Sequence, residues 1–231
     1  MKTGDYSTKR KAYEYYSNRF LGGLKYVSWD EASIINNWID KYSHKGNTYL
    51  DLGTGTGRAI KEILKNSPGK VYGLDQSKEM LYVLREKFRK EIKQGIIILL
   101  NENANKTSLK NGTIDFVTSI HLIKHIKDPD SIYKETSRVL KNNGYLLFEV
   151  LNSKSLISFN LGTCFATTYS ETAKTLTDNK IEIVEVQYLH FFGETVYKFL
   201  GPLAGWLNRI DRLLTSFLPF GTKIFILAQR T

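Results

Sequence analysis

Three glycines recur at every second position directly after a short apolar run. Gly53, Gly55 and Gly57 follow residues 49–52, and this run contains an acid, Asp51. Glycine has no Cβ atom, so such a segment turns sharply and lets a ligand approach the main chain. If a helix follows, its unpaired N–H groups attract a carboxylate or a phosphate. The spacing therefore predicts a loop that binds the anionic part of a ligand.

The spacing of the glycines also bears on which ligand is bound. Dinucleotide-binding loops have the pattern G-x-G-x-x-G, whose third glycine would fall here at Arg58. An NAD-dependent dehydrogenase, which shares the general fold, is therefore disfavoured. A second acid, Asp75, lies twenty residues beyond Gly55. One helix and one strand fill such an interval, so we expect Asp75 to lie beside the glycine turn.

The elements that position these residues follow from the pattern of apolar side chains. From residue 47 onward, short apolar runs alternate with amphipathic stretches, as in repeated strand and helix units around a parallel sheet. The run at residues 96–100 is wholly apolar, which is typical of a central strand covered on both faces. The fold class is therefore α/β. Seven strands are predicted, at residues 48–52, 70–74, 96–100, 113–120, 145–151, 181–188 and 223–228.

Helical segments flank this core on both sides. Residues 6–20 and 29–42 predict two helices before the first strand. At about residues 192–218, apolar residues recur every three or four positions, which predicts a helical insertion before the last strand. This insertion covers the core, forms a dimer face or forms a wall for an apolar acceptor. We divide the single expected domain, residues 1–231, into an N-terminal helical cap at 1–46, a core at 47–151 and a substrate-side half at 152–231.

Four ordered motifs resemble those of the class I S-adenosylmethionine-dependent methyltransferases, in particular the methyltransferase type 11 and quinone-biosynthesis group. Residues 51–57 resemble the first motif, and residues 71–77 resemble the second. Residues 113–117 and 137–144 resemble the fourth-strand motif and the R-V-L-K-P-G-G motif, with Asn-Asn in place of Pro-Gly. The resemblance is continuous from about residue 49 to residue 150. It implies a three-layer Rossmann-like sandwich with an antiparallel last strand, an enzyme that transfers a methyl group, and S-adenosylmethionine as its cofactor.

The resemblance also implies roles at the matching positions. Gly53, Thr54 and Gly55 would hold the methionine part of S-adenosylmethionine along the main chain. Asp51 would orient the ammonium group through nearby groups. Asp75 would accept hydrogen bonds from both ribose hydroxyls.

The adenine side of the site departs from the family pattern. Gln76 would lie along the adenine. The family has an acid where Asn103 stands, next to Ala104, and an amide oxygen accepts the bond from the adenine amino group more weakly. Glu102 takes this place if the register shifts by one residue. The remaining contacts would be backbone carbonyls at the end of the fourth strand, from Ser119 and Ile120.

Methyl transfer from a sulfonium donor needs few catalytic groups, because the methyl carbon is already activated. His121 leaves the predicted fourth strand near the expected methyl position, and an imidazole titrates near neutral pH. We predict His121 as the general base, with packing or pocket lining as the alternative. His121 and His125 have a spacing that suits metal ligands on a helix. Lys124, however, stands in a segment where the similar quinone-biosynthesis O-methyltransferases have acids, so no metal is predicted.

Composition and charge restrict the partners. The net charge of +10 favours anionic partners without choosing among them. A small-molecule acceptor, apolar or lipid-like in one interpretation, is the leading expectation. A nucleic-acid acceptor is permitted but disfavoured, because residues 119–122 lack the Asn/Asp-Pro-Pro-aromatic motif of enzymes that methylate base amino groups; tRNA-modifying relatives and a non-catalytic S-adenosylmethionine-binding protein remain alternatives. The single cysteine, Cys164, cannot form an internal disulfide, and the sequence shows no apolar leader or spanning segment, so we expect a cytoplasmic protein. We expect a monomer or a homodimer.

Overall fold

One mixed sheet forms the centre of the computed structural model, which describes residues 8–18, 21–155 and 164–231. Its strands lie in the order β3-β2-β1-β4-β5-β8-β7, and the short β6 pairs with β5 outside this path. Neighbours on the path run parallel, except that β8 is antiparallel to both β5 and β7. The strands are β1 Thr48–Leu52, β2 Lys70–Leu74, β3 Ile97–Leu100, β4 Ile114–Ser119, β5 Leu140–Asn152, β6 Ala166–Thr167, β7 Ile181–Leu189 and β8 Lys223–Arg230.

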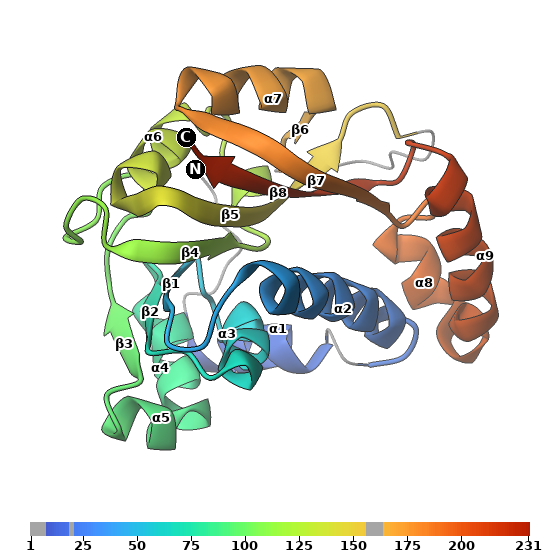
Figure 1. Cartoon of the computed structure of the whole chain (residues 1–231). Helices are drawn as coiled ribbons and strands as arrows, with labels where there is room; N and C mark the ends of the chain where they lie inside the picture. The colour runs from blue at the N-terminus through green and yellow to red at the C-terminus, as the bar shows by residue number, and fades with distance from the viewer. Residues whose placement is uncertain (1–7, 19–20, 156–163) are drawn as a thin grey trace.

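Helices cover both faces of the sheet, so the molecule has three layers (Figure 1). On one face α2, α3 and α4 pack apolar side chains against the strands, among them Ile35, Ile60 and Leu84. On the other face α6 and α7 contribute Tyr133 and Leu176. The helices and 3-10 turns are α1 Lys9–Asn18, α2 Leu24–Tyr42, α3 Arg58–Ile63, η1 Leu64–Asn66, α4 Lys78–Lys87, α5 Arg89–Lys93, η2 Ile123–His125, α6 Asp130–Val139, α7 Tyr169–Asp178, α8 Glu194–Leu200, η3 Gly201–Leu203 and α9 Ala204–Phe217.

The predicted strands are all present, and the mostly parallel sheet with an antiparallel last strand is confirmed. Two details differ. β5 begins at Leu140 rather than at residue 145, because Leu140 already pairs with Ile114 before the ladder is interrupted. The interruption includes Asn143, which has a left-handed φ of 63°. β6 has only two residues, too few to leave a pattern in the sequence.

The helix before the glycine turn also differs in extent from the prediction. α2 begins at Leu24 rather than at residue 29, because Leu24 and Val27 pack in one cluster with Tyr197 of α8. Beyond β2, Phe88 separates α4 from α5, since its φ of −114° and ψ of 34° are not helical. The helix expected at residues 6–20 contains α1; residues 6, 7, 19 and 20 lie outside the described part of the chain.

The predicted helical insertion consists of α8, η3 and α9. Figure 1 shows it at one end of the molecule, beside the N-terminal end of α2. Gly23 at the start of α2 allows this contact, since a Cβ there would lie 1.9 Å from the carbonyl oxygen of Tyr197. Within the three described ranges, no helix combines the length and the apolar character needed to cross a membrane.

Candidate active site

The glycine turn lies at the carboxyl end of β1, where the order of strands in the sheet reverses. β1 pairs with β2 on one side and with β4 on the other. Parallel α/β sheets bind ligands at such a point, beyond the carboxyl ends of the strands. Arg58 begins α3 directly after the turn. The sequence thus brings the turn, the end of β2 and the end of β4 to one edge.

Glycine is required in this turn by backbone conformation, and at one position it leaves open space. Gly53, Gly55 and Gly57 have φ angles of 66°, 52° and 79°, which residues with a Cβ rarely adopt. A Cβ at Gly57 would lie only 2.6 Å from the Phe88 ring, whereas one at Gly55 would meet nothing closer than a backbone oxygen at 4.0 Å. The main chain at Gly55 therefore borders a space that a ligand can fill.

Asp51 lies beneath the turn and is buried, with 2% of its surface exposed. Its Oδ2 accepts a hydrogen bond from the Thr54 hydroxyl at 2.6 Å, and its Oδ1 accepts one from the Thr118 hydroxyl at 2.7 Å. The carboxylate thus ties the turn to β4. Burial raises the pKa of Asp51 to about 6, although these two hydrogen bonds oppose the rise.

The raised pKa of Asp51 predicts a pH-dependent stability. Its pKa in the folded state is above the ordinary value of 3.8, so the folded protein binds more protons between about pH 4 and 6 and loses stability as the pH rises. Relative to Asp51→Asn, we expect the wild-type chain to lose about 3 kcal/mol between about pH 4 and 7. Urea unfolding of both proteins at three pH values measures this. A difference that does not change with pH would contradict the assignment.

Asp75 follows β2 and reaches the glycine turn, as its spacing predicts. Its Oδ2 accepts a hydrogen bond from the N–H of Gly55, and its Oδ1 accepts one from the N–H of Ser77, both at 2.8 Å. Burial raises the pKa of Asp75, and the two backbone bonds oppose this rise. The adjacent Gln76 is exposed. The side-chain amide of Asn101, which sequence reasoning missed, donates to the carbonyls of Asp75 and Gln76 at 3.0 Å.

The loop after β3 contains the predicted adenine contacts. Asn103 is exposed, its Oδ1 accepts a hydrogen bond from the N–H of Asn105 at 3.2 Å, and Ala104 beside it is buried. Both carboxylate oxygens of Glu102 accept bonds from Ser108, at 2.8 Å from its N–H and 2.6 Å from its hydroxyl. Because Glu102 already binds Ser108 in its own loop, Asn103 stays our candidate for accepting a hydrogen bond from the adenine amino group.

β4 ends at Ser119, and the chain then turns abruptly. The Ser119 hydroxyl is buried and has no hydrogen-bond partner among the described residues. Ile120 is also buried. His121 has a φ of 65°, a left-handed conformation that is uncommon outside glycine and that concentrates at functional sites. This conformation directs the chain off the end of β4 toward α2.

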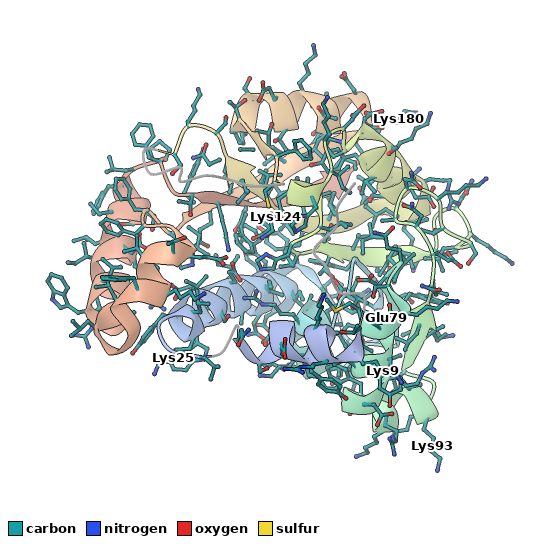
Figure 2. All side chains as sticks on the ribbon, turned by 180° about the vertical axis from the view of Figure 1, so that it is seen from behind. Lys9, Lys25, Glu79, Lys93, Lys124 and Lys180 are labelled. Atoms are coloured by element: carbon teal, nitrogen blue, oxygen red, sulfur yellow. The ribbon has the colours of Figure 1, made fainter. Side chains whose placement is uncertain are left out.

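His121 is held inside a cluster of charged side chains. Its Nε2 lies 2.7 Å from Arg58 Nη1 and 3.3 Å from Glu31 Oε2. Its Nδ1 lies 3.0 Å from Glu149 Oε1 and 2.5 Å from Lys124 Nζ. In Figure 2 Lys124 lies near the middle of the molecule, whereas Lys93 and Lys180 lie at its periphery.

Two fully buried carboxylates stand at the centre of this cluster. Glu31 pairs with Arg58 and with Lys223 at the start of β8. Burial alone would raise the pKa of Glu31, but the charges of Arg58, Lys223 and His121 hold this pKa well below its usual range. The pKa of Glu149 is likewise lowered, because His121, Lys124 and Lys223 outweigh its burial. Acids and bases from five separate elements therefore compensate one another here.

The same cluster contains a group of atoms with the spacing of a metal site. One ligand atom from each of Glu31, His121 and Glu149 lies within 4.8 Å of the others. Arg58, Lys124 and Lys223 occupy the surroundings of these carboxylates. The carboxylates that would bind a divalent cation are therefore already paired with Lys and Arg side chains. The absence of a metal stays our prediction.

Most of the partners of His121 lie outside the motifs that the sequence offers. Glu149 gives one signal, since it is a charged residue within the apolar run of β5, and buried acids require a partner. Glu31 and Lys223 belong to α2 and β8, far apart in the chain. Nothing in their local sequence indicates that they meet.

Comparison with known proteins agrees with this geometry. Residues 50–148 match the sequence model of a family described as "Methyltransferase domain". The demethylmenaquinone methyltransferase of Geobacillus sp. (strain WCH70) is 30% identical over 64% of this chain and 63% of that protein. The ubiquinone biosynthesis O-methyltransferase of Paraburkholderia xenovorans (strain LB400) is 29% identical over 50% of each. A SAM-dependent methyltransferase from Aquifex aeolicus superposes with a TM-score of 0.61, at 19% identity, over 85% of this chain and 89% of that chain.

The sheet order, the glycine turn and the acid after β2 define a Rossmann-like methyltransferase fold. Over residues 50–148 the chain is similar to the class I S-adenosylmethionine-dependent methyltransferases. It spans between half and two thirds of the length of these two curated relatives. What those relatives act on is therefore carried to this chain only as a proposal.

Proposed function

We propose that residues 1–231 act as one methyltransferase domain, which transfers a methyl group from S-adenosylmethionine to a small-molecule acceptor of apolar character. The observation that carries the proposal is the open main chain at Gly55 beside the carboxylate of Asp75. The apolar acceptor is supported by the two relatives, whose names place them in menaquinone and ubiquinone synthesis. A cytoplasmic location is part of the proposal, supported by the single cysteine, Cys164.

The residues at the turn fit the methionine and ribose parts of the cofactor. Gly55 borders the open space, where the methionine part would lie along the main chain of Gly53, Thr54 and Gly55, and Asp51 would orient it through the Thr54 hydroxyl. Asp75 already accepts two backbone hydrogen bonds, and its carboxylate has lone pairs left for the ribose hydroxyls. The bound cofactor supplies a methyl carbon activated by a sulfonium.

The adenine part would lie between Gln76 and the loop of Asn103 and Ala104. The side chains of Gln76 and Asn103 are both exposed. At the far side lie the backbone carbonyls of Ser119, which ends β4, and of Ile120. The Ser119 hydroxyl, buried and without a hydrogen-bond partner among the described residues, is a polar group that a ligand would satisfy.

His121 is our candidate general base. Nε2 is the proposed basic atom and faces the Arg58 guanidinium at 2.7 Å. This role needs the neutral tautomer with its proton on Nδ1, where Glu149 Oε1 at 3.0 Å would accept a hydrogen bond once Lys124, 2.5 Å from Nδ1, moves away. Proton transfer from the acceptor therefore requires that the acceptor displace Arg58 from Nε2.

Replacing His121 by asparagine is expected to lower kcat by about 100-fold and to remove the rise of kcat with pH that a neutral imidazole produces. His125→Asn is the matched control, because the Nδ1 of His125 on η2 lies 3.7 Å from Cys164 Sγ, and its interaction with Lys124 and Glu149 of the charge cluster is electrostatic only. Steady-state kinetics over pH 5–9 separate the two. A variant with a changed KM and an unchanged pH profile would assign His121 to positioning.

A labelled methyl-transfer screen tests the proposed function. The protein is incubated with S-adenosylmethionine labelled on its methyl group and with separate pools of metabolites, lipids and RNA. We expect label in a small acceptor that extracts into organic solvent, with an equal amount of S-adenosylhomocysteine. Label confined to RNA would favour the alternative of an RNA-modifying enzyme, which the charge of +10 permits. Binding without turnover would favour a non-catalytic S-adenosylmethionine-binding protein.

A further inference from the structure

The helical insertion exposes a row of large apolar side chains. We call these five residues the apolar stripe: Phe199, Leu203, Trp206, Leu213 and Phe217. Their exposed fractions are 89%, 69%, 70%, 61% and 78% in this order. The α9 members recur at intervals of seven and four residues, so they share one side of the helix. Large apolar side chains gathered in this way mark a surface that meets another apolar surface.

The packing of the insertion against the rest of the protein does not use this stripe. α9 buries a different face, which contains Ala204, Leu207 and Asp211. Asp211 accepts hydrogen bonds from the Tyr197 hydroxyl at 2.5 Å and from the N–H of Phe192 at 3.3 Å. Both helices are therefore fixed by their inner faces. The exposed apolar residues contribute nothing to that packing, and folding alone does not account for them.

The charge around the stripe is positive. Lys198 and Arg209 are exposed on the same two helices, whereas Arg212 pairs with Asp30 of α2. The acids of residues 194–218 are Glu194, which pairs with Lys223, and the buried Asp211. Figure 2 shows Lys25, at the start of α2, at the end of the molecule where the insertion lies. Exposed aromatic and aliphatic groups thus stand among cations whose nearby acids are already engaged.

We propose that the apolar stripe docks on the surface of an anionic lipid bilayer. Phe, Trp and Leu side chains enter the boundary between headgroups and acyl chains, while Lys and Arg contact acidic headgroups. Charge complementarity selects this occupant over a second copy of the chain. In a two-fold dimer, the cations around one stripe would face those around the other, within a protein whose net charge is +10.

Docking at this surface would place the active site close to the bilayer. Glu194 begins α8 and pairs with Lys223 at 2.7 Å, and Lys223 in turn pairs with Glu31 of the charge cluster. The insertion and the surroundings of His121 are therefore joined through Lys223 by two ion pairs, of which the one to Glu31 is buried. The inference adds a location to the proposed function, but lipid binding itself needs neither the methyl donor nor the acceptor.

Sedimentation with vesicles tests the docking on the full chain without cofactor. The vesicles contain phosphatidylcholine alone or phosphatidylcholine with about 30% phosphatidylserine. We expect binding to the anionic vesicles, at least tenfold weaker binding by Trp206→Ser/Phe217→Ser, and a similar loss for Lys198→Glu/Arg209→Glu. The matched control is Tyr169→Ser/Val184→Ser, which removes two half-exposed apolar side chains from α7 and β7.

Circular dichroism and S-adenosylmethionine binding show that each variant is folded. Equal vesicle binding by the wild type and Trp206→Ser/Phe217→Ser would overturn the proposal. The proposal would also be overturned if the wild type formed a dimer that did not bind vesicles and Trp206→Ser/Phe217→Ser were a monomer. The stripe would then be covered by a second copy of the chain. A folded protein that docks but transfers no methyl group would contradict the proposed function alone.

Discussion

Replacing Asp75 by alanine is expected to weaken S-adenosylmethionine binding by at least about 100-fold. The carboxylate lies at the turn, where it accepts backbone bonds from Gly55 and Ser77. Hydrogen bonds to a charged group contribute about 1.5–3 kcal/mol each, and two ribose hydroxyls would lose their acceptor. Isothermal titration calorimetry measures the change directly.

Glu79→Ala is the matched control for this prediction. Glu79 is an acid in the first turn of α4 and accepts a hydrogen bond from the Ser77 hydroxyl at 3.1 Å. It lies near Asp75 in sequence, but its hydrogen-bond partner is Ser77 and not the glycine turn. We expect its loss to change affinity by less than about threefold. Equal affinities of Asp75→Ala and the wild type would refute the ribose assignment.

Replacing Glu31 by alanine is expected to lower the free energy of unfolding by about 3–5 kcal/mol. The carboxylate is fully buried and pairs with Arg58 and Lys223. Its removal leaves Lys223, Arg58 and His121 without their shared partner, and the buried ammonium of Lys223 cannot regain water. Urea unfolding followed by circular dichroism gives the value.

An exposed ion pair supplies the comparison for Glu31. Glu185 of β7 pairs with Lys41 of α2, and the Lys41 side chain is 60% exposed. Pairs of this kind contribute about 1 kcal/mol or less, so Glu185→Ala should change stability far less than Glu31→Ala. Similar losses in the two variants would mean that the buried cluster has no special weight in the fold.

The sheet and the glycine turn were predictable because their signals are local. The run at 96–100 is apolar throughout and forms β3 from Ile97 to Leu100. Serine is a residue type favoured at helix N-caps, and the Ser77 hydroxyl accepts a hydrogen bond from the N–H of Met80 at 3.2 Å. The twenty-residue interval from Gly55 to Asp75 predicted that these residues meet, and the N–H of Gly55 donates to Asp75 Oδ2 at 2.8 Å.

The charge cluster was not predictable, because its members meet only through the tertiary fold. His121 could be selected by type and position, but Glu31 lies ninety residues before it in the chain and Lys223 lies beyond every motif. The helical insertion has the same limit. Its periodicity predicts helices, yet Leu207 is buried and Phe217 is 78% exposed, although both fit the apolar pattern. Only the packing against α2 decides between them.

A crystal structure with S-adenosylhomocysteine tests the central claim most directly. The proposed site predicts both ribose hydroxyls within hydrogen-bond distance of the Asp75 carboxylate and the homocysteine part along Gly53 to Gly55, with the sulfur facing His121. A product bound elsewhere, or a ribose that does not contact Asp75, would contradict the assignment of the cofactor site.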